Sequence, residues 1–161
     1  MNQFVMITDS GSDLPAELLQ QWGVERLNLT FHFEGEEQEY EDGSMEPKAF
    51  YDRMKAGDVA KTAAVNMDRF INAFEPVLKE GKDVLYIGFS SGLSATYHAA
   101  TLAAEDLMEH YPDRRVVTVD TLAASAGQGM LVWLAVEKMK SGASIDEVAA
   151  FVEKERLNLA H

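Results

Sequence analysis

Residues 84–96 read VLYIGFSSGLSAT, an apolar run followed at once by small residues that carry hydroxyl groups. The run Val84–Phe89 has no polar alternation, which is typical of a strand buried on both faces of a parallel sheet. A helical pattern follows from about Leu93 to His110. The sequence therefore predicts a strand, a hydroxyl-rich turn and a helix, the unit from which parallel α/β sheets are built.

The turn itself resembles an anion site, because Ser90, Ser91, Ser94 and Thr96 place four hydroxyl groups around Gly92. The first turn of a helix has backbone N–H groups without partners and carries the positive end of the helix dipole. Phosphates and carboxylates bind there readily, and hydroxyl groups add donors. A single N-cap serine would be the simpler interpretation of any one of these residues. Four together favour an anion site built from hydroxyls and free amides.

The rest of the chain continues the alternation of strands and helices, so the predicted fold class is α/β, three-layer α/β/α with a mainly parallel sheet. No repeat or linker interrupts it, and we expect a single domain over residues 1–161. The further predicted elements are strands at 4–8, 27–31 and 116–119, an exposed acidic hairpin of 31–33 with 38–40, and helices at 15–22, 47–57, 67–78, 123–140 and 144–157.

Composition and charge exclude several classes of function. The 161 residues are 47% hydrophobic, which is enough for a real core, and the net charge of −13 argues against a nucleic-acid surface. There is no cysteine, so disulfides and thiol nucleophiles are excluded, and the four histidines lack ligand spacing, so no metal site is expected. Neither a signal peptide nor a membrane-spanning stretch is apparent, which favours a cytoplasmic protein.

Polar segments follow three of the predicted strands, and ligands of open parallel sheets bind beyond the carboxyl ends of the strands. Each residue alone has a simpler role as a turn, cap or loop residue, but their convergence favours one binding edge. The segments are Asp9-Ser10-Gly11-Ser12-Asp13, Ser90-Ser91-Gly92 and Asp120-Thr121, and the predicted loop Lys61-Thr62-Ala63-Ala64 is placed to reach the same edge.

An enzymatic alternative rests on Gly88-Phe89-Ser90-Ser91-Gly92, which matches the G-x-S-x-G nucleophile elbow of esterases. Asp120 follows one strand later. A triad also needs a histidine, and none is well placed: His98 and His110 fall in the helix after the serine, His32 lies in the hairpin region and His161 is the last residue. An esterase using Ser90 and a generic binder of small acids are the alternatives.

Taken together, these segments resemble the DegV family of bacterial lipid-binding proteins along essentially the whole chain. The opening VMITDSGSDLP at residues 5–15 resembles the family's own, and Ser90–Tyr97 resembles its S-S-G-L-S-G-T-Y segment. Lys61-Thr62-Ala63 stands where the family has K-T-S, and Val119-Asp120-Thr121 where it has a later Asp-Ser motif. The departures are Ala63-Ala64-Val65 for Ser-Gln-Pro, Ala95 for glycine and Thr121 for serine.

The resemblance implies a carrier rather than an enzyme, with no catalytic residue and no cofactor of its own. It would present a long-chain fatty acid to a fatty acid kinase, which supplies ATP and phosphorylates the carboxylate. Thr62 and Ser91 would hold that carboxylate, with Ser90 as the alternative to Ser91. Lower-ranked residues at the rim of the site are Ser94, Asp9, Ser10, Asp120 and Thr121.

Family members also carry a second domain with a Gly-Gly-Arg segment, so the resemblance covers their N-terminal half. We therefore expect the 161-residue chain to bind fatty acid weakly and to self-associate through an exposed apolar wall. A carrier of this kind is also compatible with transient membrane contact.

Overall fold

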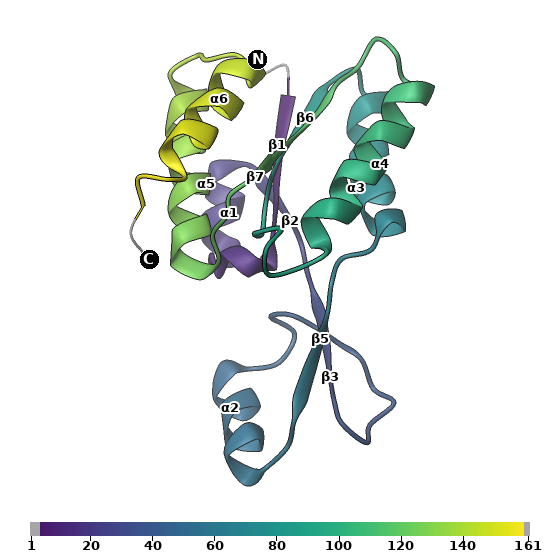
Figure 1. The fold of residues 1–161 in the computed structure, drawn as a ribbon, viewed down its shortest axis with the longest axis vertical. Coiled ribbons are helices and arrows are strands. Elements are labelled where there is room, and N and C mark those ends of the chain that lie inside the picture. Colours follow the sequence, from purple (N-terminus) through teal and green to yellow (C-terminus); the bar gives the residue numbers. More distant parts are fainter. Residues whose placement is uncertain (1–3, 160–161) are drawn as a thin grey trace.

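The computed structural model describes residues 4–159 and contains a four-stranded parallel sheet in the order β2-β1-β6-β7. Its strands are β1 (Phe4–Asp9), β2 (Val24–Leu27), β6 (Asp83–Gly88) and β7 (Val116–Asp120). Every neighbouring pair is parallel. Figure 1 shows helices on both sides of this sheet, so the predicted three-layer α/β/α fold is confirmed.

Each face of the sheet has its own core, because successive side chains of a strand point to opposite faces. Leu85 and Ile87 of β6 pack with α1 (Ala16–Trp22), α5 (Ser125–Lys140) and α6 (Ile145–Glu155). Val84 and Tyr86 of the same strand pack with α3 (Met67–Lys79) and α4 (Thr96–His110). β6 is thus buried on both faces, as its continuous apolar run predicted.

Most predicted boundaries hold within a few residues. Gly23 ends α1 with a left-handed φ of 69°, and Ser144 and Glu147 form the expected capping box of α6. Two boundaries differ around the hydroxyl-rich turn. The strand ends at Gly88, and the helix begins at Thr96 rather than Leu93, because the N–H groups of Leu93 and Ser94 both bond to the carbonyl of Ser90 in a tight turn.

A small lobe, residues 30–63, stands beyond the carboxyl edge of the parallel sheet (Figure 1). It holds an antiparallel sheet in the order β4-β3-β5, made of β3 (Thr30–Phe33), β4 (Tyr40–Glu41) and β5 (Ala60–Ala63), with α2 (Pro47–Ala56). Phe31 and Phe33 are buried, and the Phe50 ring of α2 lies edge-on to Phe31 at 5.1 Å. Aromatic packing therefore joins the helix to the small sheet.

The small lobe corrects two predictions. The expected strand at 27–31 is wrong as one element, because the chain leaves the parallel sheet after Leu27 and enters the small sheet at Thr30. The expected loop at 61–64 is wrong as well, because Thr62 pairs with Phe31 in the antiparallel ladder. The predicted hairpin is confirmed by the pairing of Phe31 with Tyr40, although its apolar face is covered.

Hydrogen bonds fix the small lobe to the larger one at both places where the chain passes between them. The Leu29 N–H donates to Ser10 Oγ at 3.0 Å, and the Val65 N–H donates to Thr96 Oγ1 at 3.2 Å. Arg69 of α3 donates to the Asn28 carbonyl at 2.8 Å and forms an ion pair with a small-lobe carboxylate. No helix within residues 4–159 has the length and apolar character needed to cross a membrane.

Candidate functional site

The strand order reverses between β1 and β6, since β2 lies outside β1 and β7 lies outside β6. Connections that leave two such strands diverge to opposite faces of the sheet and open a crevice between them. The turn after β1, residues 10–13, and the loop after β6, residues 89–95, flank this crevice. The site predicted at the carboxyl edge therefore has a definite place in the topology.

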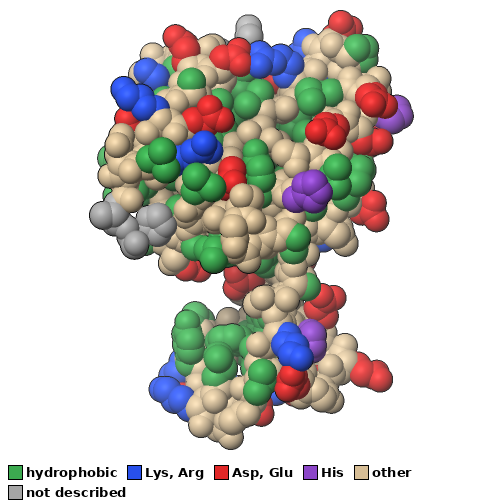
Figure 2. All heavy atoms as spheres, in the orientation of Figure 1, with side chains coloured by type: hydrophobic (Ala, Val, Ile, Leu, Met, Phe, Trp, Pro, Cys, Tyr) green, Lys and Arg blue, Asp and Glu red, His purple; other side chains and the backbone are tan. Residues whose placement is uncertain are grey.

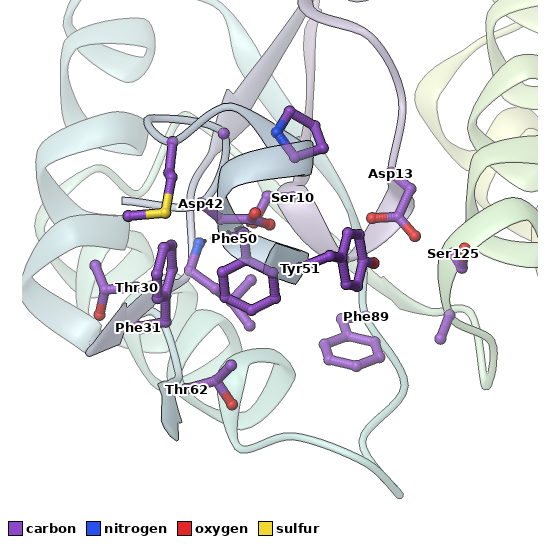
Figure 3. Close-up of a pocket in the computed structure, with 16 residues that line it drawn as sticks. Ser10, Asp13, Thr30, Phe31, Asp42, Phe50, Tyr51, Thr62, Phe89 and Ser125 are labelled. Atoms are coloured by element: carbon purple, nitrogen blue, oxygen red, sulfur yellow. Dashed lines mark hydrogen bonds between the residues drawn. The ribbon is translucent and has the colours of Figure 1, made fainter. Parts of the chain in front are cut away.

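A cavity of about 440 Å³ lies at this place, between the carboxyl edge and the small lobe (Figure 3). Its size is within the range typical of small-molecule sites. Figure 2 shows hydrophobic side chains of the small lobe gathered where this lobe faces the notch between the two. The lining is apolar at Leu29, Phe31, Met45, Pro47, Phe50, Tyr51 and Phe89, and polar at Ser10, Asp13, Thr30, Asp42, Thr62 and Ser125.

The structure places the leading candidates differently with respect to this cavity. Thr62 and Ser10 line it directly. Ser90 and Ser91 follow the lining residue Phe89 and stay outside the lining. Ser91 is exposed, whereas Ser90 is only 6% exposed. Of the two serines, Ser91 is therefore the one whose hydroxyl is open to a ligand.

The prediction of free amides is wrong for most of the hydroxyl-rich turn. The N–H groups of Phe89, Ser90 and Ser91 donate to Asp9 Oδ2 at 2.9 Å, the Ala123 carbonyl at 3.0 Å and Asp120 Oδ1 at 3.2 Å. The next amides are used within the turn, since the Gly92 N–H bonds to Ser90 Oγ. Any anion bound here would be recognised by hydroxyl groups, because these amides already have partners.

The lower-ranked rim residues hold the loops together. Ser10 Oγ accepts the Leu29 N–H, and Asp120 Oδ1 accepts the N–H groups of Ser91 and Leu122. Thr121 Oγ1 donates to the Gly88 carbonyl at 2.7 Å, and Ser94 Oγ accepts the Thr96 N–H at 3.2 Å. Each hydroxyl or carboxylate thus has an internal partner that fixes the edge of the site.

Asp9 is fully buried and has the most partners among the candidates. Its carboxylate accepts hydrogen bonds from Gly11, Tyr86, Phe89 and Gln128. Burial raises the pKa of Asp9, and the four donors oppose that effect. Burial, together with the Asp9 charge, also raises the pKa of Tyr86 well above its ordinary range, so Tyr86 is a neutral donor.

Sequence reasoning missed the aromatic wall that α2 and β3 supply, and it missed Gln128. No signal in the sequence places Phe50 and Tyr51 against the carboxyl edge, since their position depends on the small lobe. Gln128 did carry a signal, because it is a polar residue at the start of an apolar stretch of the predicted helix, residues 129–136. Its buried Oε1 has no hydrogen-bond partner, while its Nε2 donates to Thr8 and Asp9.

The geometry gives no support to Ser90 as a nucleophile. Ser90 Oγ accepts the Gly92 N–H, and within residues 4–159 no histidine is hydrogen-bonded to it. His110 Nδ1 lies 2.8 Å from the carbonyl of Asp106 at the end of α4. His161 lies outside the described residues. Across residues 4–159, no group of three or more His, Cys, Asp or Glu side chains is arranged to hold a metal ion.

A family model described as "Uncharacterised protein, DegV family" matches residues 3–159 of this chain. A DegV domain-containing protein of Clostridium perfringens, CPE0026, is 41% identical over 162 residues, which cover 100% of this chain and 56% of that protein. A DegV domain-containing protein of Streptococcus pyogenes, SPs1668, is 34% identical over 151 residues, covering 93% of this chain and 53% of that protein.

Solved structures match along the same length. One, described as showing fatty acid binding of a DegV family protein from Thermus thermophilus, superposes with a TM-score of 0.84 at 32% identity. The match covers 96% of this chain and 53% of the Thermus thermophilus protein. A DegV lipid-binding protein from Thermotoga maritima superposes with a TM-score of 0.82 at 28% identity, and the match covers 98% of this chain and 55% of that protein. The chain thus spans about half the length of the relatives it matches.

Proposed function

Because the chain belongs to the DegV family, we propose that it binds a long-chain fatty acid in the cavity between its two lobes. The observation that supports this proposal most strongly is the apolar and aromatic lining of the cavity at the carboxyl edge of the sheet. The Thermus thermophilus relative, whose structure is described as showing fatty acid binding, supports the choice of ligand. Thr62 and Ser91 are the proposed donors to the carboxylate, with Ser90 as the alternative.

The acyl chain supplies most of the affinity in this proposal. Each buried methylene contributes about 0.8 kcal/mol, so a sixteen-carbon chain contributes roughly 10 kcal/mol before entropy losses. A hydrogen bond to the charged head contributes about 1.5 to 3 kcal/mol. The hydroxyl groups of Thr62 and Ser91 therefore position the head, while Phe31, Phe50 and Phe89 hold the chain.

Charge inside the cavity indicates which way the acid lies. Asp13 and Asp42 both line the cavity, and no Lys or Arg is among the described lining residues. In the view of Figure 3, Thr62 lies apart from both aspartates. A carboxylate head near Thr62 avoids the repulsion that it would meet beside Asp13 or Asp42.

The proposal extends to the fate of the bound acid, which a partner kinase phosphorylates. A carboxylate oxygen would attack the γ-phosphoryl group of ATP held by the kinase, which yields an acyl phosphate and ADP. Holding the head by hydroxyls, rather than in a bidentate arginine clamp, leaves one oxygen open for that attack. The protein itself then acts as a carrier with neither a catalytic residue nor a cofactor.

Exposed apolar side chains around the cavity bear on how tightly the 161-residue chain binds. Tyr51 is 59% exposed although it lines the cavity, and Met54 of the same helix is 44% exposed. We expect the chain alone to bind fatty acid weakly and to self-associate through this wall. Monomeric chain with tight acyl binding, measured by sedimentation and calorimetry, would contradict this part of the proposal.

Calorimetric titration with palmitate tests the carboxylate contacts. Thr62→Val and Ser91→Ala should each weaken binding about ten-fold, since each removes one hydrogen bond to a charged group. Thr101→Val is the control, because the Thr101 hydroxyl bonds within α4 to the carbonyls of Tyr97 and His98. Unchanged binding in both variants would refute the assignment, and ester hydrolysis lost in Ser90→Ala would favour the esterase.

A further inference from the structure

The carboxylate of Asp9 accepts four hydrogen bonds and joins the end of β1 to β6 with its following loop and to α5. Oδ1 accepts the Gly11 N–H at 2.9 Å and Gln128 Nε2 at 3.1 Å. Oδ2 accepts the Phe89 N–H at 2.9 Å and the Tyr86 hydroxyl. Both oxygens are thus used twice, by donors from the turn after β1, from α5, from the loop after β6 and from β6 itself. An ionised carboxylate is the side chain that accepts four such bonds.

Two of these four partners also form the wall of the cavity. Gly11 and Phe89 both line it, one on each side of the point where the strand order reverses. Their connections would otherwise diverge, because β1 and β6 feed opposite faces of the sheet. Asp9 lies behind both residues, fully buried, and ties them to a single point.

The same contacts fix the Phe89 ring. A Cβ atom built on Gly11 would lie 2.9 Å from Phe89 Cγ and 2.8 Å from Asp9 Oδ1, closer than real Cβ contacts allow. The ring therefore lies directly against the backbone of Gly11. Phe89 is held by its N–H on one side and by this contact on the other, and Ser90 and Ser91 follow it in the chain.

We propose that Asp9 is a positioning residue of the fatty-acid site, which holds Phe89 against the cavity and thereby sets the start of the loop that presents Ser91. It acts through these neighbours and does not contact the ligand. Its effect on binding rests on the proposed function. Its effect on the loop does not, because the four hydrogen bonds join residues of the chain itself.

Asp9→Asn tests whether the side chain acts as a hydrogen-bond acceptor, because asparagine has nearly the same volume as aspartate but one acceptor oxygen fewer. An asparagine has one acceptor oxygen and one NH₂ group, so two of the four donors lose their acceptor. Placing the NH₂ group at the Oδ2 position is the less costly arrangement, because there the Tyr86 hydroxyl only has to turn and accept. At the Oδ1 position Gln128 would have to turn its amide and give up its hydrogen bond to Thr8. The Phe89 N–H cannot turn, so the variant releases this amide.

Tyr86→Phe is the matched control. It removes one hydrogen bond to the same carboxylate and leaves the Phe89 N–H bond in place. Both variants are expected to lower stability, so a loss of stability alone does not distinguish them. Amide exchange at Phe89 does, when it is normalised to the exchange of Leu85 in the core of β6.

The first measurement is hydrogen exchange by NMR on the ligand-free protein. Relative to Leu85, the Phe89 and Ser91 amides should exchange about ten-fold faster in Asp9→Asn and within about two-fold of wild type in Tyr86→Phe. Equal rates in wild type and Asp9→Asn would overturn the proposal, as would equal acceleration in both variants.

The second measurement is palmitate affinity by calorimetry. Asp9→Asn should bind about ten-fold more weakly than wild type, and Tyr86→Phe within about two-fold. Wild-type affinity in Asp9→Asn, despite faster exchange, would overturn the positioning role in binding. Absence of palmitate binding by wild type would refute the proposed function instead, and the exchange experiment would still decide whether Asp9 holds the loop.

Discussion

Gly11→Ala tests the close packing at the centre of the site. The new methyl group would lie 2.8 Å from Asp9 Oδ1, 2.9 Å from Phe89 Cγ and 3.1 Å from Gln128 Oε1. Asp9 cannot retreat without losing its four hydrogen bonds, so the Phe89 ring should move instead, into the cavity that it lines. Overpacking of this kind costs about 1 to 3 kcal/mol.

The expected loss of about 2 kcal/mol corresponds to a melting temperature roughly 4 to 8 °C lower for a domain of this size. Thermal unfolding followed by circular dichroism, with urea unfolding beside it, measures both quantities. Gly92→Ala is the control, since a Cβ there meets only Ser90 Oγ at 3.5 Å and should change stability by less than about 0.5 kcal/mol. A Gly11→Ala variant as stable as Gly92→Ala would refute the account of this packing.

Two further predictions concern hydrogen bonds at the edges of the fold. Asp120→Ala removes the acceptor of the Ser91 N–H and should accelerate hydrogen exchange of this amide about ten-fold. Asp120→Asn retains the acceptor oxygen, so the exchange rate should change less than about two-fold. Similar exchange rates in the two variants would contradict this prediction. Hydrogen bonds from Ser144 hold the pKa of Glu147 below its ordinary 4.5. The folded form therefore favours the ionised carboxylate, and its contribution to stability is present above the unfolded pKa and lost as the pH falls through the lowered folded pKa. In an NMR titration, Ser144→Ala removes the bond from the hydroxyl and keeps the larger effect of the Ser144 N–H, so the Glu147 pKa should rise only part of the way towards 4.5. An unchanged pKa would refute the contribution of the Ser144 hydroxyl.

The larger lobe was predictable because its elements follow simple periodicities. Val84–Phe89 is apolar at every position, and residues 67–78 repeat their apolar side chains at helical spacing, so both were assigned correctly. Ser144 and Glu147 carry the capping-box pattern, and the helix begins there. In each case the residues that form the element also contain its signal.

The small lobe could not be predicted in the same way. Strand β5 has the sequence AKTA, and three of its four residues are exposed. Its strand character comes from backbone pairing with β3, which leaves no apolar alternation for sequence analysis to detect. The aromatic wall of the cavity was missed because the position of Phe50 and Tyr51 depends on how this lobe packs beyond the carboxyl edge.

The role of Asp9 was beyond sequence reasoning because its partners are distant in the chain. Tyr86 and Gln128 are 77 and 119 residues away. A short acidic residue after a strand is equally compatible with a turn, a cap and a ligand contact. The structure shows the four donors, two of which, Gly11 and Phe89, line the cavity.

Isotope-filtered NMR with ¹³C-labelled palmitate measures most directly whether a fatty acid occupies the cavity between the lobes. A fatty acid in this cavity should give nuclear Overhauser contacts from its acyl chain to the rings of Phe50 and Phe89, which line the cavity. A second apolar hollow, lined by Trp22 and Trp133 beside α5, is the competing location. Contacts to those two tryptophans, with none to Phe50 or Phe89, would show that the acid does not bind between the lobes.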